Sequence, residues 1–298
     1  MNRRPAAVAT ALMTAAALLF SVMALLAKAS ASRIPGPEVA FVRFVCGLVA
    51  VALAATRLRL RTHNWRGLFL RGLFGGTAVL CYFLAIEHLD VGLATLLNYT
   101  APVFTALFAW LFLGEAIGPG TFVALVVTTA GVALVIVGRA PPGATVLGGW
   151  PLVGILSSVL SGAAVATIRQ VRKTDGAWEI FCAFCLLGAL FTGIPTARHW
   201  VTPAARDWPL LVAMGVTAVA AQLMMTQALR DLPAAAAGVL FQLTPVATLL
   251  LGRLLYGERS RPTAIVGAVV TIAGVGWGAW LAASRPAGRA APTPTDDP

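Results

Sequence analysis

The chain has 298 residues, of which 59% are hydrophobic and 11% are charged, and its formal net charge is +11. This composition excludes a soluble globular domain, because charged residues make up about 25% of an ordinary soluble chain. A nucleic-acid-binding role is also excluded, because it would need the basic charge gathered on one soluble face. The sequence therefore indicates an integral membrane protein with the lipid bilayer as its surroundings.

Ten mostly apolar stretches of about 20 residues, the length that crosses a bilayer, follow one another along the chain. They cover residues 8–27, 37–56, 68–87, 92–113, 119–138, 148–167, 177–196, 208–228, 235–255 and 262–282. The connections between them are short turns marked by Gly and Pro. We expect an all-α integral membrane protein of ten transmembrane helices, followed by a disordered cytoplasmic tail at 285–298 that lacks apolar residues.

The second half of the chain repeats the first at a shift of 143 residues. Residues 85–132 match residues 228–275 without a gap at about 19 of 48 positions. The matches keep Pro102 in register with Pro245, and the pair Gly114–Glu115 in register with Gly257–Glu258. We therefore expect two five-helix repeats, at 1–142 and 143–284, as in many secondary transporters. Residues 148–196 match the first half only loosely, so functional residues are not transferred there by symmetry.

Five helices is an odd number, so the second repeat enters the membrane inverted relative to the first. Lysine and arginine gather in cytoplasmic loops, and this rule can test the expected topology. With the N-terminus inside, thirteen basic residues, Arg71 among them, fall on the cytoplasmic side and seven fall outside. The charge pattern favours a multi-pass protein of the cytoplasmic membrane with both termini inside.

The matched prolines Pro102 and Pro245 lie within apolar spans and predict a break in each helix. Proline has no backbone N–H, and this frees the carbonyl of the residue four positions earlier. Such a defect is tolerated in a bilayer only where protein or a water-filled cavity satisfies it. Polar side chains lie just before both prolines, and these are our first candidates for substrate binding: Asn98, Tyr99, Gln242 and Thr244. The alternative is that they only bond neighbouring helices.

Further candidates lie in the spans at 68–87 and 208–228. Tyr82 and Gln222, with Met224 and Met225 close by, would suit a zwitterionic or aromatic metabolite. Serines 157, 158 and 161 share one face of the span at 148–167, where they serve either helix packing or the substrate.

Arg43 lies about two turns inside the span at 37–56, and a charged residue within a membrane is by default a functional hypothesis. It would bind a substrate carboxylate, lock its helix against a neighbour, or reach to the outer surface near Glu38. The acidic residues, by contrast, all fall at span ends, in loops or in the tail. No carboxylate is therefore placed to carry protons through the membrane centre, and the coupling ion stays open.

Small residues form stripes on two spans, at Ala124, Thr128 and Gly131 and at Gly267, Thr271, Gly274 and Gly278. Such stripes let helices approach closely, and these would either join the halves or form a homodimer. The four cysteines lie inside apolar spans and are expected to be small buried residues. We expect no metal and no cofactor. The chain has no His-Glu-x-x-His or Gly-x-Ser-x-Gly motif, so an intramembrane enzyme is not favoured.

The paired motifs resemble the EamA family of the drug/metabolite transporter superfamily. The resemblance rests on ATLLNYTAP at 94–102 with Leu113–Glu115, on AAGVLFQLTP at 236–245 with Leu255–Glu258, and on Arg43. It implies a small-molecule substrate moved by alternating access, with an amino acid or related metabolite exported. Import of a vitamin or a nucleoside-like solute is the alternative within the class. A non-transporting scaffold or lipid-handling membrane protein is the alternative outside it.

Overall fold

The structure is a computed structural model that describes residues 4–30, 34–89, 91–138, 149–256 and 261–284. Within these ranges all regular elements are α-helices, which confirms the expected class. The helices are α1 (Arg4–Ser30), α2 (Gly36–Ala55), α3 (Trp65–His88), α4 (Val91–Asn98), α5 (Ala101–Leu113), α6 (Pro119–Val137), α7 (Trp150–Val171), α8 (Ala177–Arg198), α9 (Trp208–Ala228), α10 (Ala234–Phe241), α11 (Leu243–Tyr256) and α12 (Pro262–Ser284). The tail at 285–298 and the Gly257–Glu258 pair lie outside the described residues.

The helices match the ten expected spans. In the described part of the chain, nine helical segments are long and apolar enough to cross a membrane, and α10 with α11 forms one of them, Ala234–Leu255. The tenth span consists of the short helices α4 and α5 in succession. The chain is therefore a multi-pass membrane protein.

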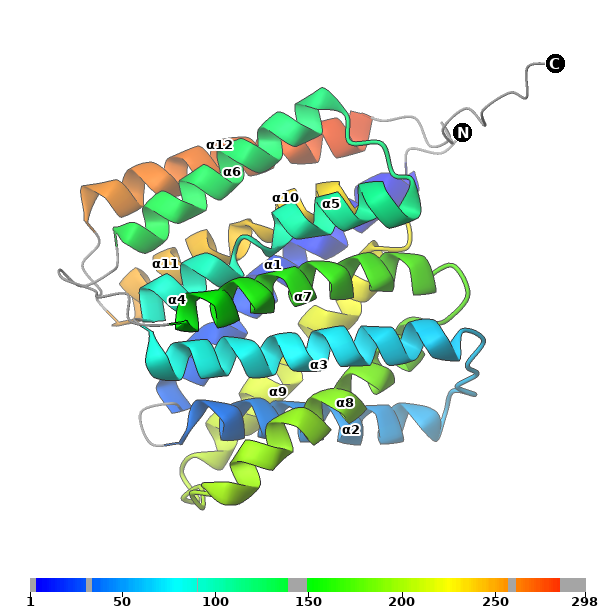
Figure 1. Ribbon diagram of the computed structural model, residues 1–298, viewed down its shortest axis with the longest axis vertical. Coiled ribbons are helices and arrows are strands. Elements are labelled where there is room, and N and C mark those ends of the chain that lie inside the picture. The colour runs from blue at the N-terminus through cyan, green and yellow to red at the C-terminus, as the bar shows by residue number, and fades with distance from the viewer. Residues whose placement is uncertain (1–3, 31–33, 90, 139–148, 257–260, 285–298) are drawn as a thin grey trace.

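The helices run between two ends of the bundle (Figure 1). One end carries the α2–α3, α5–α6, α7–α8 and α9–α10 connections, which hydrogen bonds join to one another. Because many arginines lie there, we call it the basic end. At the opposite end, the backbone N–H of Val201 in the α8–α9 connection donates to Glu38 at the start of α2.

The packing of the helices follows a two-fold pattern. Helix α1 packs against α9 in the second half, and α3 packs against α7 in the corresponding way. Helices α2 and α8 pack against each other, and so do α6 and α12. These eight helices are thus paired across the halves, and much of the core of the molecule lies at the interface between the two repeats.

The small-residue stripes of α6 and α12 meet inside one chain. A Cβ atom added to Gly131 would lie 2.8 Å from the backbone nitrogen of Thr271, and one added to Gly274 would lie 2.7 Å from Thr128. Figure 1 shows the two helices side by side along the upper edge of the bundle. The stripes therefore join the two halves, one of the two outcomes that the sequence left open.

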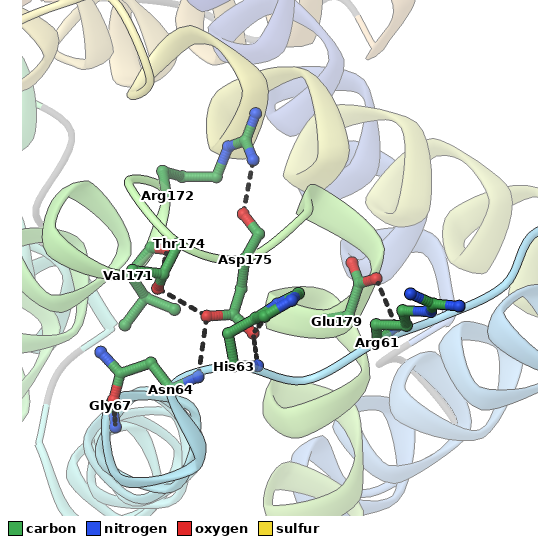
Figure 2. Close-up of polar contacts among 9 residues, drawn as sticks. All are labelled: Arg61, His63, Asn64, Gly67, Val171, Arg172, Thr174, Asp175 and Glu179. Carbon is green, nitrogen blue, oxygen red and sulfur yellow. Dashed lines mark hydrogen bonds and ion pairs between the residues drawn. The ribbon is translucent and has the colours of Figure 1, made fainter.

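A buried carboxylate fastens the halves together at the basic end (Figure 2). Asp175, in the turn between α7 and α8, accepts the backbone N–H groups of His63 and Asn64 at 2.7 and 3.1 Å. Asn64 in turn caps the first turn of α3 by accepting the N–H of Gly67 at 2.9 Å. The tie holds the start of α3 against the end of α7.

Candidate functional site

Two helix breaks lie inside the bundle, one in each half. Helix α4 ends at Asn98 and α5 begins at Ala101, while α10 ends at Phe241 and α11 begins at Leu243. Pro102 and Pro245 lie in the first turns of α5 and α11, where proline is tolerated because an N–H there has no partner within the helix. The polar residues before each proline therefore lie at or beside irregular backbone within a membrane span.

Gln242 connects the two breaks. Its amide nitrogen donates to the hydroxyl of Thr129 in α6 at 3.1 Å, and to the backbone carbonyl of Tyr99 at 3.4 Å. The Tyr99 ring lies 6.5 Å from the ring of Phe241, at 23° to it. Gln242 is fully buried, and in the described structure its amide oxygen has no hydrogen-bond partner. An acceptor that is buried and unpaired at the meeting of two broken helices could bind a donor on a solute.

The polar side chains on α3 and α4 form a second group against α7. Ser157 donates to the side-chain oxygen of Asn98 at 3.2 Å and to the carbonyl of Ala78 at 2.9 Å. The hydroxyl of Tyr82 lies 3.2 Å from that of Thr95. These bonds tie neighbouring helices, so Ser157 contributes to packing. Asn98 and Tyr82 share this group, and among the described residues no hydrogen bond joins them to Gln242.

Two further candidates lie apart from these groups. Thr244 donates to the carbonyl of Ala17 at 3.2 Å and accepts, at its own carbonyl, the hydroxyl of Ser21 at 3.0 Å. It therefore fixes α11 to α1. Gln222 in α9 is 4% exposed, and its amide nitrogen has no partner in the described residues. It is a buried unpaired donor, as Gln242 is a buried unpaired acceptor.

The described contacts of Arg43 are with aromatic rings and not with Glu38 near the outer end of its helix. Its guanidinium carbon lies 5.6 Å from the ring centroid of Phe44 and 5.8 Å from that of Phe184 in α8. The carboxylate of Glu38 is instead held by Val201. Of the three roles considered for Arg43, the contacts support a position against neighbouring helices and leave substrate binding as a proposal.

The structure corrects the placement of Arg71. The expected topology places it among the cytoplasmic basic residues, but it lies in the second turn of α3 and is 3% exposed. Its guanidinium carbon lies 4.0 Å from the Phe184 ring centroid. The signal available in the sequence was its place after residue 68, inside an expected span and just before Gly72, Gly75 and Gly76, which let α3 approach α8 closely.

An open cavity of about 530 Å³ lies at the basic end between α1, α8 and α9. Its walls include Trp178, Met224 and Gln227, with the arginines Arg172 and Arg230. None of the predicted binding residues lines it, although Met224 lies two residues after Gln222 in α9. The cavity and the predicted binding residues are therefore two separate features of the molecule.

Among the described residues no group of three or more His, Cys, Asp or Glu side chains could hold a metal ion. The predicted binding residues instead offer hydrogen bonding, aromatic stacking and positive charge. This set is suited to binding a polar organic solute.

Several known proteins with sequences similar to this chain are transporters. The pseudopaline exporter CntI of Pseudomonas aeruginosa is 31% identical over 217 residues, which cover 72% of this chain and 75% of that protein. An uncharacterized transporter of Helicobacter pylori is 27% identical over 232 residues, covering 73% of this chain and 76% of its own length. The rat solute carrier family 35 member E4 is 27% identical over 218 residues, 70% of this chain and 61% of that protein.

A solved crystal structure has the same fold. It superposes with a TM-score of 0.79 over 92% of this chain and 97% of its own, at 23% sequence identity. The sequence profile of the EamA-like transporter family matches this chain twice, at residues 8–137 and 148–277. With a matched segment in each half and relatives that are transporters, the chain belongs to the EamA-like transporter family.

Proposed function

We propose that the chain exports an amino acid or a related small metabolite across the cytoplasmic membrane of a bacterium by alternating access. The exporter among its relatives supports this direction, and bacterial relatives support the location. The substrate would bind where the two broken helices meet, and the halves would rock about that point. The basic end would face the cytoplasm, because its loops hold most of the arginines.

The observation that carries the proposal is the contact of Gln242 with Tyr99 across the two repeats. A buried polar group without a partner costs about 1–3 kcal/mol. The structure has such a group at Gln242 and another at Gln222. A solute with a hydrogen-bond donor would remove the cost at Gln242 on binding, and it would stack on the paired rings of Tyr99 and Phe241. This suits an amino acid or a related zwitterion.

Import of a vitamin or a nucleoside-like solute is the second candidate, because an aromatic ring between Tyr99 and Phe241 would stack equally well. A non-transporting scaffold is the candidate from a different class. A scaffold would need no unpaired buried groups at a helix break, whereas the chain has one at Gln242.

The test compares metabolites inside and outside bacterial cells that express wild type, Tyr99→Ala or Gln242→Ala at matched membrane levels. Leu254→Ala is the control, because Leu254 lies on α11, the helix that follows the second break, but near the far end of that helix, and it is 79% exposed. For an exporter, one metabolite falls inside and rises outside with wild type and Leu254→Ala, but not with the site variants. The reverse movement indicates the importer. Equal metabolite levels with all four proteins would refute transport through this site.

A further inference from the structure

Two arginines lie within the membrane span on neighbouring helices, and the proposed substrate site makes no use of their pairing. Arg43 in α2 and Arg71 in α3 both direct their guanidinium groups at Phe184 in α8, with carbon-to-centroid distances of 5.8 and 4.0 Å. Helix α8 packs against both α2 and α3, so the two charges share one interface. Cys185, the next residue on α8, is the nearby titratable side chain that bears on both arginines.

The Arg71 charge lies deep in the bilayer. A Cβ atom built on Gly75 would collide with the Nη1 atom of Arg71, so the guanidinium lies against the helix at the level of Gly75. Gly75 is ten residues into α3, which corresponds to about 15 Å at the rise of an α-helix. This is about half of the hydrocarbon thickness of a bilayer. The Arg71 charge therefore lies near the midplane, where an arginine is functional by default.

The two arginines lack a counter-charge within the described part of the chain. Among the described residues no carboxylate pairs with Arg43 or Arg71, and Nε and Nη1 of Arg71 have no hydrogen-bond partner. The described carboxylates that form hydrogen bonds do so elsewhere: Glu38 with Val201, Glu115 with Arg169, Asp175 with His63 and Asn64, Glu179 with Arg61, and Asp207 with Ala204. Phe184 offers its ring face to both cations but no negative charge. Two positive charges in one interface repel each other, and an anion between them would remove that repulsion.

We propose that Arg43 and Arg71 form an anion-binding site between α2, α3 and α8 that takes a carboxylate group of the transported solute. The guanidinium fork can bind both oxygens of a carboxylate through two N–H groups, and Nε and Nη1 of Arg71 are adjacent donors without a partner. The inference rests on the proposed function, since it assigns a charge to the substrate class. It also predicts that a neutral solute of equal size is a poor substrate.

The test measures thermal unfolding of the full chain, purified in a neutral detergent, during titration with acetate, succinate or citrate. Each acid is compared with its neutral amide and with inorganic phosphate, and choline chloride holds the ionic strength constant. At least one carboxylate should raise the unfolding temperature of wild type in a saturable way, while its amide and phosphate do not. Arg71→Gln should raise the half-saturating concentration about ten-fold or more, the loss expected for a charged hydrogen bond. Arg71→Lys should retain part of the binding, because it keeps the charge but loses the fork.

Arg66→Gln is the matched control, because Arg66 lies on the same helix, is exposed and stacks on Trp65. It should titrate like wild type. The proposal is overturned if no carboxylate stabilises wild type, if phosphate or the amides stabilise it equally, or if Arg71→Gln titrates as Arg66→Gln does. If transport in cells depends on Gln242 while Arg71→Gln transports normally, the anion site is wrong and the proposed function stands. If transport depends on neither residue, both are wrong.

Discussion

Asp175 provides a sharp test of how the halves are held together at the basic end. Its Oδ1 accepts the N–H of His63 at 2.7 Å, and its Oδ2 accepts the N–H of Asn64 at 3.1 Å and the hydroxyl of Thr174 at 2.6 Å. The side chain is 0% exposed, so water does not replace a lost bond (Figure 2). We predict that Asp175→Asn strongly destabilises the protein although it changes only one atom.

The expected loss of stability follows from the hydrogen bonds that Asp175 accepts. The amide nitrogen of asparagine cannot accept, so one backbone N–H, that of His63 or Asn64, loses its partner and faces another donor. Losing one hydrogen bond to a charged group costs about 1.5–3 kcal/mol, and the remaining two weaken from charged to neutral strength. The sum is about 3–5 kcal/mol. Since 1 kcal/mol moves the melting temperature of a chain of this size by about 2–4 °C, we expect a fall of roughly 6 °C or more.

Glu179→Gln is the matched control, because this carboxylate accepts only the N–H of Arg61, at 3.1 Å and in an exposed position. Its loss should cost less than about 1 kcal/mol and lower the melting temperature by no more than about 4 °C. The assay follows tryptophan fluorescence of the detergent-purified variants during heating. Equal shifts for the two variants, or no shift for Asp175→Asn, would refute the reasoning that burial and multiple acceptance determine the strength of this tie.

Two further variants test other contacts between the halves. Glu115→Gln removes the charge that accepts Nε of Arg169 at 2.7 Å, with both side chains about four-fifths buried; the same heating assay should show a loss of about 1.5–3 kcal/mol. Gly131→Val would place side-chain atoms where a Cβ already lies 2.8 Å from the Thr271 backbone, so we expect a large fall in the yield of monodisperse protein by size-exclusion chromatography. Gly276→Val on α12, where a Cβ meets no neighbour within 4 Å, is the control and should leave the yield unchanged. Equal yields of the Gly131→Val and Gly276→Val proteins would show that the packing of α6 and α12 does not depend on close approach.

The sequence predicted the spans well because a bilayer imposes a simple length rule on apolar segments. Proline also located both helix breaks to within a few residues, since it removes a donor wherever it occurs. The sequence could not predict which polar groups lie in contact with one another. Thr129, the partner of Gln242, has no local signal in the sequence. A span that faces lipid and a span that faces other helices have similar composition, so the sequence does not show which side chains of two spans meet. Arg71 was placed wrongly because its charge alone does not distinguish an arginine in a loop from a buried arginine that lies one turn inside the next helix.

The central claim is that a solute crosses the membrane through the site formed by the two helix breaks. The most direct measurement is counterflow in liposomes that contain the purified protein and are loaded with the metabolite identified in cells. Wild type and Leu254→Ala should accumulate labelled metabolite transiently and saturably, and Gln242→Ala should lose this uptake while it remains folded and monodisperse. Undiminished counterflow in Gln242→Ala would contradict the account and move the transport path away from the breaks.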